Sequence, residues 1–167
     1  GSQWGTQGTN SHGYATVTGD SAGLAPDYQA FLAGLGTGGE RWSGVMTQYC
    51  QGIAIGAYGC GAKAAEVGYP TGGALAGIWE DNSAAAPSAA TAAQIEAEAV
   101  ATAQHFGNTT KAMNRNVQYV VVSPTGTDPD NYEQNGFCAW HDWSGDGYAG
   151  SAVGPIAFTN MPYIIDV

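Results

Sequence analysis

Basic residues are scarce in this sequence. Only four occur among 167 residues, against fourteen Asp and Glu, for a formal net charge of −10. The four are Arg41, Lys63, Lys111 and Arg115. Nucleic acids and anionic membrane surfaces are bound mainly through Lys and Arg, so this balance argues against both as partners.

Long apolar runs are also missing. No stretch reaches the roughly 20 apolar residues of a membrane helix, and no basic and then apolar signal segment opens the chain. Charged residues make up only 11 % of the sequence, so small polar residues and Ala must cover the surface. This composition is typical of extracellular proteins, and we expect a secreted protein whose export signal has been removed.

Common catalytic motifs are absent too. The sequence has no Gly-x-Ser-x-Gly elbow, no His-Glu-x-x-His zinc motif, no phosphate-binding Gly-rich loop and no Cys-x-x-Cys pair. The residues alone therefore do not specify a reaction.

Three cysteines are present. Cys50 and Cys60 flank a Gly-rich segment short enough to close as a loop, which predicts a disulfide in an oxidising compartment; two free buried thiols are the alternative. Cys138 is then the odd one, which indicates either a partner outside this chain or a buried free thiol.

The length and the 44 % hydrophobic content predict one domain over residues 1–167. Helical spacing predicts helices with buried faces, and β-branched runs predict strands, the run at 117–122 being the expected central strand. The expected helices are 24–35, 40–49 and 87–106, and the expected strands are 53–55, 75–79, 117–122, 137–141 and 156–159. Alternating helices and strands predict an α/β fold, with helices packed on a mixed β-sheet.

His141 and Asp142, framed by Trp140 and Trp143, are the first candidate catalytic pair. A His beside a carboxylate can act as a base or bind a metal. Neighbours on a strand point to opposite faces, so a purely structural histidine is the alternative.

Acidic loops give two further candidates. Asp142, Ser144 and Asp146, followed by Gly147, match the start of a calcium loop, but Val153 stands where a Glu ligand is needed. An ordinary turn is the alternative. Two carboxylate pairs, Asp128 with Asp130 and Glu80 with Asp81, suit an acid-active hydrolase. Solvated loop acids are the alternative. Glu96 and Glu98 are expected on the solvent-exposed side of their helix.

Six segments together carry a resemblance over essentially the whole chain. They are residues 1–7, 31–39, 69–73, 118–126, 136–142 and 158–163, the fifth reading Gly-Phe-Cys-Ala-Trp-His-Asp. In order and spacing the chain resembles a group of secreted bacterial proteins and, more remotely, the exordium-like (phosphate-induced) family.

This resemblance implies a metallopeptidase-like architecture. In such relatives the chain continues through a further Cys into a helix with a Gly-His-Glu-x-Ala-Glu motif, suited to zinc. The resemblance thus implies an N-terminal portion lacking that helix, with Cys138 paired to a missing segment or a second chain.

Three functions follow as hypotheses. The first is a secreted peptidase-like hydrolase acting on peptides. The second is a non-catalytic module that binds glycan or cell wall, and the third is the acid-active hydrolase. For the second, exposed aromatic rings would stack on sugars; the expected platform is Trp140, Trp143, Tyr148 and Trp79.

Overall fold

The computed structural model describes residues 6–9, 12, 15–17, 19–20, 22–54, 57–62, 65–145 and 150–167. These residues form two compact units, one of residues 1–23 and 79–167 and the other of residues 24–78. The expectation of one domain stays a prediction.

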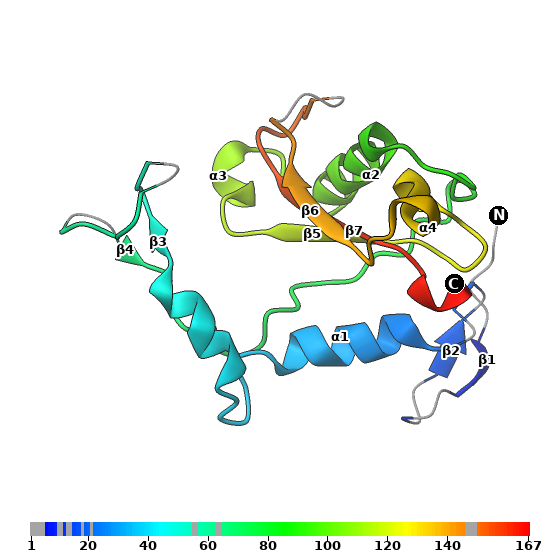
Figure 1. Cartoon of the computed structure of the whole chain (residues 1–167), viewed down its shortest axis with the longest axis horizontal. Coiled ribbons are helices and arrows are strands. Elements are labelled where there is room, and N and C mark those ends of the chain that lie inside the picture. Colours follow the sequence, from blue (N-terminus) through cyan, green and yellow to red (C-terminus); the bar gives the residue numbers. More distant parts are fainter. Residues whose placement is uncertain are drawn as a thin grey trace. The chain divides into compact units, whose positions relative to one another are not determined.

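The first unit, unit 1, is built on a three-stranded mixed sheet (Figure 1). Its strands are β5 (Gln118–Val122), β6 (Trp140–Trp143) and β7 (Ala157–Met161). β7 lies in the middle, parallel to β5 and antiparallel to β6. A separate antiparallel pair, β1 (Thr6–Thr9) and β2 (Ala15–Val17), belongs to the same unit.

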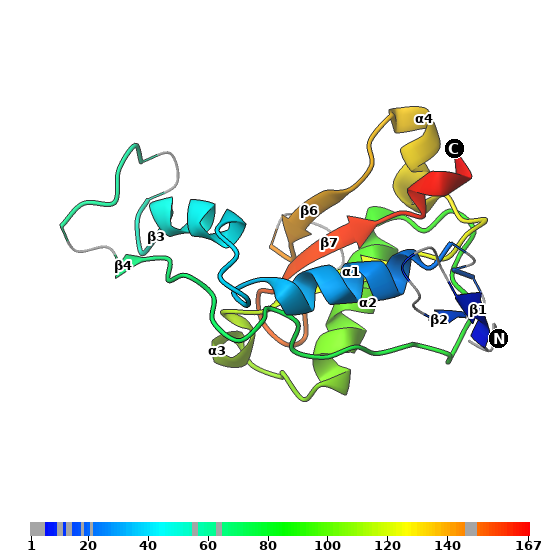
Figure 2. The same ribbon diagram turned by 90° about the horizontal axis from the view of Figure 1, so that it is seen from below.

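The helix α2 (Ala92–His105) packs against this sheet (Figure 2). Thr91 and Gln94 form the capping box that starts it, and Ala supplies much of its interior. Ile95, Ala99 and Ala103 recur at helical spacing and are buried with Phe158 of β7. The mixed sheet with a packed helix confirms the predicted α/β class.

Short helical segments connect these elements. They are α3 (Lys111–Asn114), α4 (Tyr132–Asn135) and the 3₁₀ turns Pro129–Asn131 and Ile164–Asp166. The Pro129–Asn131 turn also contacts α2.

Unit 2 contains α1 (Leu24–Gly34), the 3₁₀ turn Trp42–Gln48 and the two-residue strands β3 (Cys50–Gln51) and β4 (Ala65–Glu66). The loop at 70–74 returns along the end of α1, where Ala74 N–H donates to the carbonyl of Leu32. Gly36 is needed there because its φ is +76° and an added Cβ would lie 2.2 Å from the carbonyl oxygen of Pro70.

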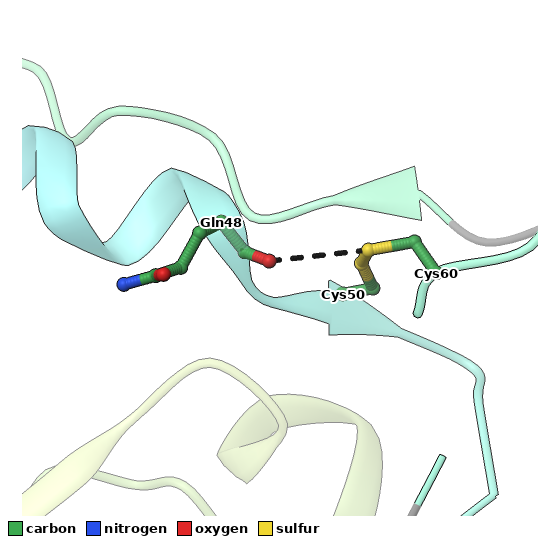
Figure 3. Close-up of a disulfide and its surroundings, with 3 residues drawn as sticks. All are labelled: Gln48, Cys50 and Cys60. Atoms are coloured by element: carbon green, nitrogen blue, oxygen red, sulfur yellow. Dashed lines mark hydrogen bonds between the residues drawn. A yellow bond between two sulfur atoms is a disulfide. The ribbon is translucent and has the colours of Figure 1, made fainter. Parts of the chain in front are cut away.

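The predicted disulfide is present in unit 2 (Figure 3). It joins Cys50 on β3 to Cys60, with Cα atoms 5.6 Å apart. The Cys60 sulfur lies 3.9 Å from the carbonyl oxygen of Gln48. Cys138, in unit 1, is free and exposed, which makes the expectation of a buried thiol wrong.

Several local predictions need correction. The β-branched run forms β5, but it is an edge strand of the described sheet, since β7 takes the centre. No residue of α1 is fully buried, so its predicted buried face is at most half-buried in the structure. Residues 75–79 form no strand, Ile53 follows β3 rather than lying in it, and Ile55 lies outside the described residues.

Candidate functional site

A pocket of about 870 Å³ opens in unit 1 beside α3 and the paired ends of β6 and β7. Most of its wall is apolar, with two cations at one side. Its lining residues are Lys111, Ala112, Asn114, Arg115, Val117, Trp143, Pro155, Ile156 and Ala157. A concave, largely apolar space with a few polar groups is the usual form of a ligand site.

Hydrogen bonds hold the α3 wall of this pocket in place. Thr110 caps α3 by accepting from Met113 N–H at 3.3 Å. The Asn114 side chain is buried, and its amide donates to the carbonyls of Asn108, Thr110 and Val153 at 2.8, 3.1 and 3.2 Å. Its Oδ1 accepts from the hydroxyl of Tyr119 on β5, so α3 is fixed to the sheet.

The opposite wall comes from the β6–β7 hairpin. Ser144 closes it twice, since its N–H donates to the Ile156 carbonyl and its Oγ accepts from Ile156 N–H, both at 3.0 Å. Trp143 faces Ala157 across the strand pair. These bonds place the Trp143 ring at the pocket beside Ile156.

Trp143 combines placement at the pocket with exposure. Its side chain is 47 % exposed and its indole lies over Gly145. A Cβ added at Gly145 would lie 2.0 Å from two atoms of that ring. Gly145 therefore leaves the space that the indole occupies.

The cations of the pocket belong to one turn of chain. Lys111 begins α3, and Arg115 follows it four residues later with helical backbone angles. Both are exposed, and neither forms an ion pair with an acidic residue in the described ranges. Sequence reasoning missed these two residues, although their i, i+4 spacing in a chain so poor in cations was a usable signal.

His141 and Asp142 lie on β6 and alternate as expected. His141 is exposed and Asp142 half-buried. Asp142 Oδ1 accepts the N–H of Trp143 at 2.8 Å. The catalytic assignment of this pair stays a prediction.

The tryptophans of the predicted sugar platform have different environments in the structure. Trp140 is half-buried, packs edge-on against Phe158 and donates through Nε1 to Asp130 Oδ2 at 3.0 Å, so it is held as a structural group. Trp79 stacks on His105 with ring centroids 4.4 Å apart. Tyr148 lies outside the described residues, which leaves Trp143 as the platform residue that lines the pocket.

The calcium candidates are partly occupied by other bonds. Ser144 Oγ closes the hairpin, Asp142 Oδ1 accepts a backbone N–H, and Asp146 lies outside the described residues. Within the part of the chain that the structure describes, no three His, Cys, Asp or Glu side chains converge to hold a metal.

The Asp128 and Asp130 carboxylates mainly organise a turn. Asp128 Oδ1 accepts from Glu133 N–H at 3.2 Å, and Asp130 accepts from Trp140. Asp130 and Asn131 both have positive φ, at 59° and 53°. The N–H groups of Asp128 and Asp130 donate to the carbonyls of Ser88 and Ala90, each at 2.7 Å, and so fix this turn to the chain before α2.

A second electrostatic cluster surrounds the Trp79–His105 stack. The pKa of Glu98 is raised mainly by burial and, to a lesser extent, by the negative charge of Asp81. Hydrogen bonds from Ser83 lower the pKa of Asp81, and the electrostatic interaction with His105 lowers it further. Glu98 is half-buried and Glu96 is buried. The prediction that both lie on the solvent-exposed side of their helix was therefore wrong, because α2 contacts both the sheet and the Pro129–Asn131 turn.

In unit 2 the most perturbed acid is Glu40. Hydrogen bonds from Ser43, first through its hydroxyl and then its N–H, and from Gly36 N–H lower the pKa of Glu40 to about 2. The Gly36 and Ser43 N–H groups lie 2.8 and 3.0 Å from its two oxygens, and the Tyr69 hydroxyl donates to Oε1 at 2.9 Å. Glu40 thus joins the end of α1, the 3₁₀ turn and the returning loop.

The described helices include none long and apolar enough to cross a membrane. Comparisons of this chain with protein-family models, curated proteins and solved structures found no match.

Proposed function

We propose that this chain is an extracellular binding module that takes carbohydrate in the pocket between α3 and the β6–β7 hairpin. The observation that carries the proposal is the half-exposed indole of Trp143 at a pocket of about 870 Å³. A pocket of that volume lies within the range of small-ligand sites.

The chemistry of the wall suits a sugar. The C–H face of a pyranose ring can cover an aromatic ring, while its hydroxyl groups need polar partners or water. Trp143 supplies the aromatic face, and Lys111 and Arg115 supply donors within the same pocket. Asn114 needs no hydrogen-bond partner from the ligand, since its amide already donates to three carbonyls.

Secretion is part of the same proposal. The Cys50–Cys60 disulfide supports it, because disulfides persist mainly in oxidising compartments. The low content of charged residues also supports it.

The test is a titration with soluble cello-, xylo-, chito- and glucuronoxylo-oligosaccharides, followed by calorimetry. We expect saturable binding of at least one, and a loss of at least about tenfold in affinity for Trp143→Ala. Trp42→Ala is the matched control, because Trp42 is 67 % exposed but belongs to unit 2. Absence of binding across the panel, or equal loss in both variants, would overturn the proposal.

A peptidase-like role remains a second proposal and rests on the family resemblance. The exposed free thiol of Cys138 supports its premise of a disulfide to a further segment or chain. Among the described residues, no three His, Cys, Asp or Glu side chains converge as a zinc site would require. Non-reduced intact mass with zinc analysis tests it: a Cys138-linked polypeptide carrying zinc is expected, and a metal-free chain with a titratable Cys138 thiol would contradict it.

A further inference from the structure

Positive charge in unit 1 is confined to one pocket. The unit carries eleven acidic residues and only two basic ones, Lys111 and Arg115. Both line the pocket that holds Trp143. An anion approaching this unit therefore meets attractive side-chain charge at this pocket.

Both cations are available to a ligand. Each is exposed and free of ion pairs with described acidic residues. Their i, i+4 spacing keeps them on the same side of the α3 turn. An Arg guanidinium can bind a carboxylate through two parallel hydrogen bonds, and a Lys adds a third donor group.

The backbone that carries them is fixed relative to Trp143. Asn114 ties α3 to Val153, and Gly154 lies against Lys111, where an added Cβ would be 3.0 Å from the Lys111 nitrogen. Residues 155–157, which follow directly, line the pocket together with Trp143. These contacts join the backbone segments that carry the cations and Trp143, and a fixed spacing of that backbone lowers the entropy lost when a ligand binds both.

Resting on the proposed carbohydrate function, we propose that the pocket selects an acidic sugar, a hexuronate, over its neutral counterpart. The sugar ring packs on Trp143, and its carboxylate binds Arg115 and Lys111. Because Lys111 and Arg115 line the pocket, an anionic ligand complements its charge. The acidic remainder of the unit repels long polyanions, so the expected ligand is a short oligosaccharide or one with a single uronate.

The test compares a glucose oligosaccharide with the same oligosaccharide oxidised at C6 of its terminal glucose to glucuronate. Calorimetry is expected to give an affinity at least about tenfold higher for the uronate at low salt. This preference should shrink as salt screens the charges. In the double variant Lys111→Gln with Arg115→Gln, the ratio of the two Kd values should fall to about one.

Arg41→Gln is the matched control, because Arg41 is an exposed cation of unit 2; it should keep the preference, and thermal melts verify that each variant is folded. Equal affinities in the wild-type protein, or a preference that survives in the double variant, would overturn the inference alone. Binding of inorganic phosphate as tight as that of the uronate would reveal a general anion site and also overturn it. Failure of both of these sugars to bind would also overturn the inference, and only failure of the whole oligosaccharide panel would remove the carbohydrate function itself.

Discussion

At the scale of single residues, the site depends on a glycine, because Gly145 has no side chain in the space beside the Trp143 ring. Gly145 leaves the space that the Trp143 indole fills. The sequence predicted Trp143 as part of an aromatic platform for sugars. The role of Gly145 could not be read from the sequence, because Gly is equally expected in a loop that only turns the chain.

Gly145→Ala tests this arrangement. The new Cβ would lie 2.0 Å from the ring, so the indole must move away from the pocket. We expect sugar affinity to fall about tenfold or more, with Trp143 more accessible to acrylamide quenching. Gly150→Ala would be an unsuitable control, because Gly150 has φ +75°. Gly59→Ala in unit 2, where an added Cβ meets nothing within 4 Å, is suitable. Unchanged affinity in Gly145→Ala would contradict the placement of Trp143.

Glu40 provides a prediction about pH. Its pKa of about 2 lies below the ordinary value of 4.5, so the folded unit favours the ionised carboxylate. Stability from Glu40 is therefore fully present above pH 4.5 and is lost as the pH falls toward 2. Unfolding followed across this window should show a decline that Glu40→Gln reduces, and an NMR titration of Glu40 with a midpoint near 4.5 would contradict the account.

At the scale of elements, α2 shows what sequence can predict. Local signals define it: Thr91 and Gln94 form the capping box, Ala favours helix, and Gly107 follows its end. The predicted range, 87–106, contains the helix but begins five residues before Ala92. The burial of Glu96 was not predictable, because it depends on elements distant in sequence that cover the helix.

The cap can be tested directly. Thr91→Ala removes the acceptor of Gln94 N–H and should lower the free energy of unfolding of unit 1 by about 1 kcal/mol. Thr109→Ala, at an exposed site outside both α2 and α3, should change it by less than about 0.5 kcal/mol. Chemical denaturation measures both, and equal effects would show that the capping box contributes little.

Strand order was the harder element to predict. The run Tyr119 to Val122 indicated a central strand, yet the centre is β7, whose buried residues are Phe158 and Asn160. A buried Asn in the middle strand gives no apolar signal. Its amide donates to the Pro129 carbonyl at 3.5 Å, a partner that sequence spacing could not reveal.

At the scale of the whole molecule, the sequence predicted the fold class and the disulfide, and it marked Trp143 as a candidate site residue. It did not lead to the pocket. Lys111 and Arg115 are separated from Trp143 by about thirty residues, and the β5–β7 and β6–β7 pairings together with the Asn114 bonds bring them to one pocket. Long-range placement of this kind is set by packing rather than by local pattern.

The disulfide belongs to unit 2, which has no fully buried apolar side chain among its described residues. Cross-linking a segment of this length should stabilise it by about 2–3 kcal/mol, mainly by restricting the unfolded chain. The variant Cys50→Ser with Cys60→Ser should therefore lose protection from proteolysis within residues 24–78 first. Cys138→Ser is the control, and equal resistance in the double variant would contradict this dependence.

The central claim is that Trp143 is the aromatic surface on which carbohydrate binds. The most direct measurement follows the indole N–H resonances of the five tryptophans by NMR during titration with the oligosaccharide panel, with Trp143→Phe assigning its peak. The account predicts a saturable shift of the Trp143 resonance while those of Trp42 and Trp79 stay in place. A silent Trp143 resonance, or equal shifts of all five, would contradict it.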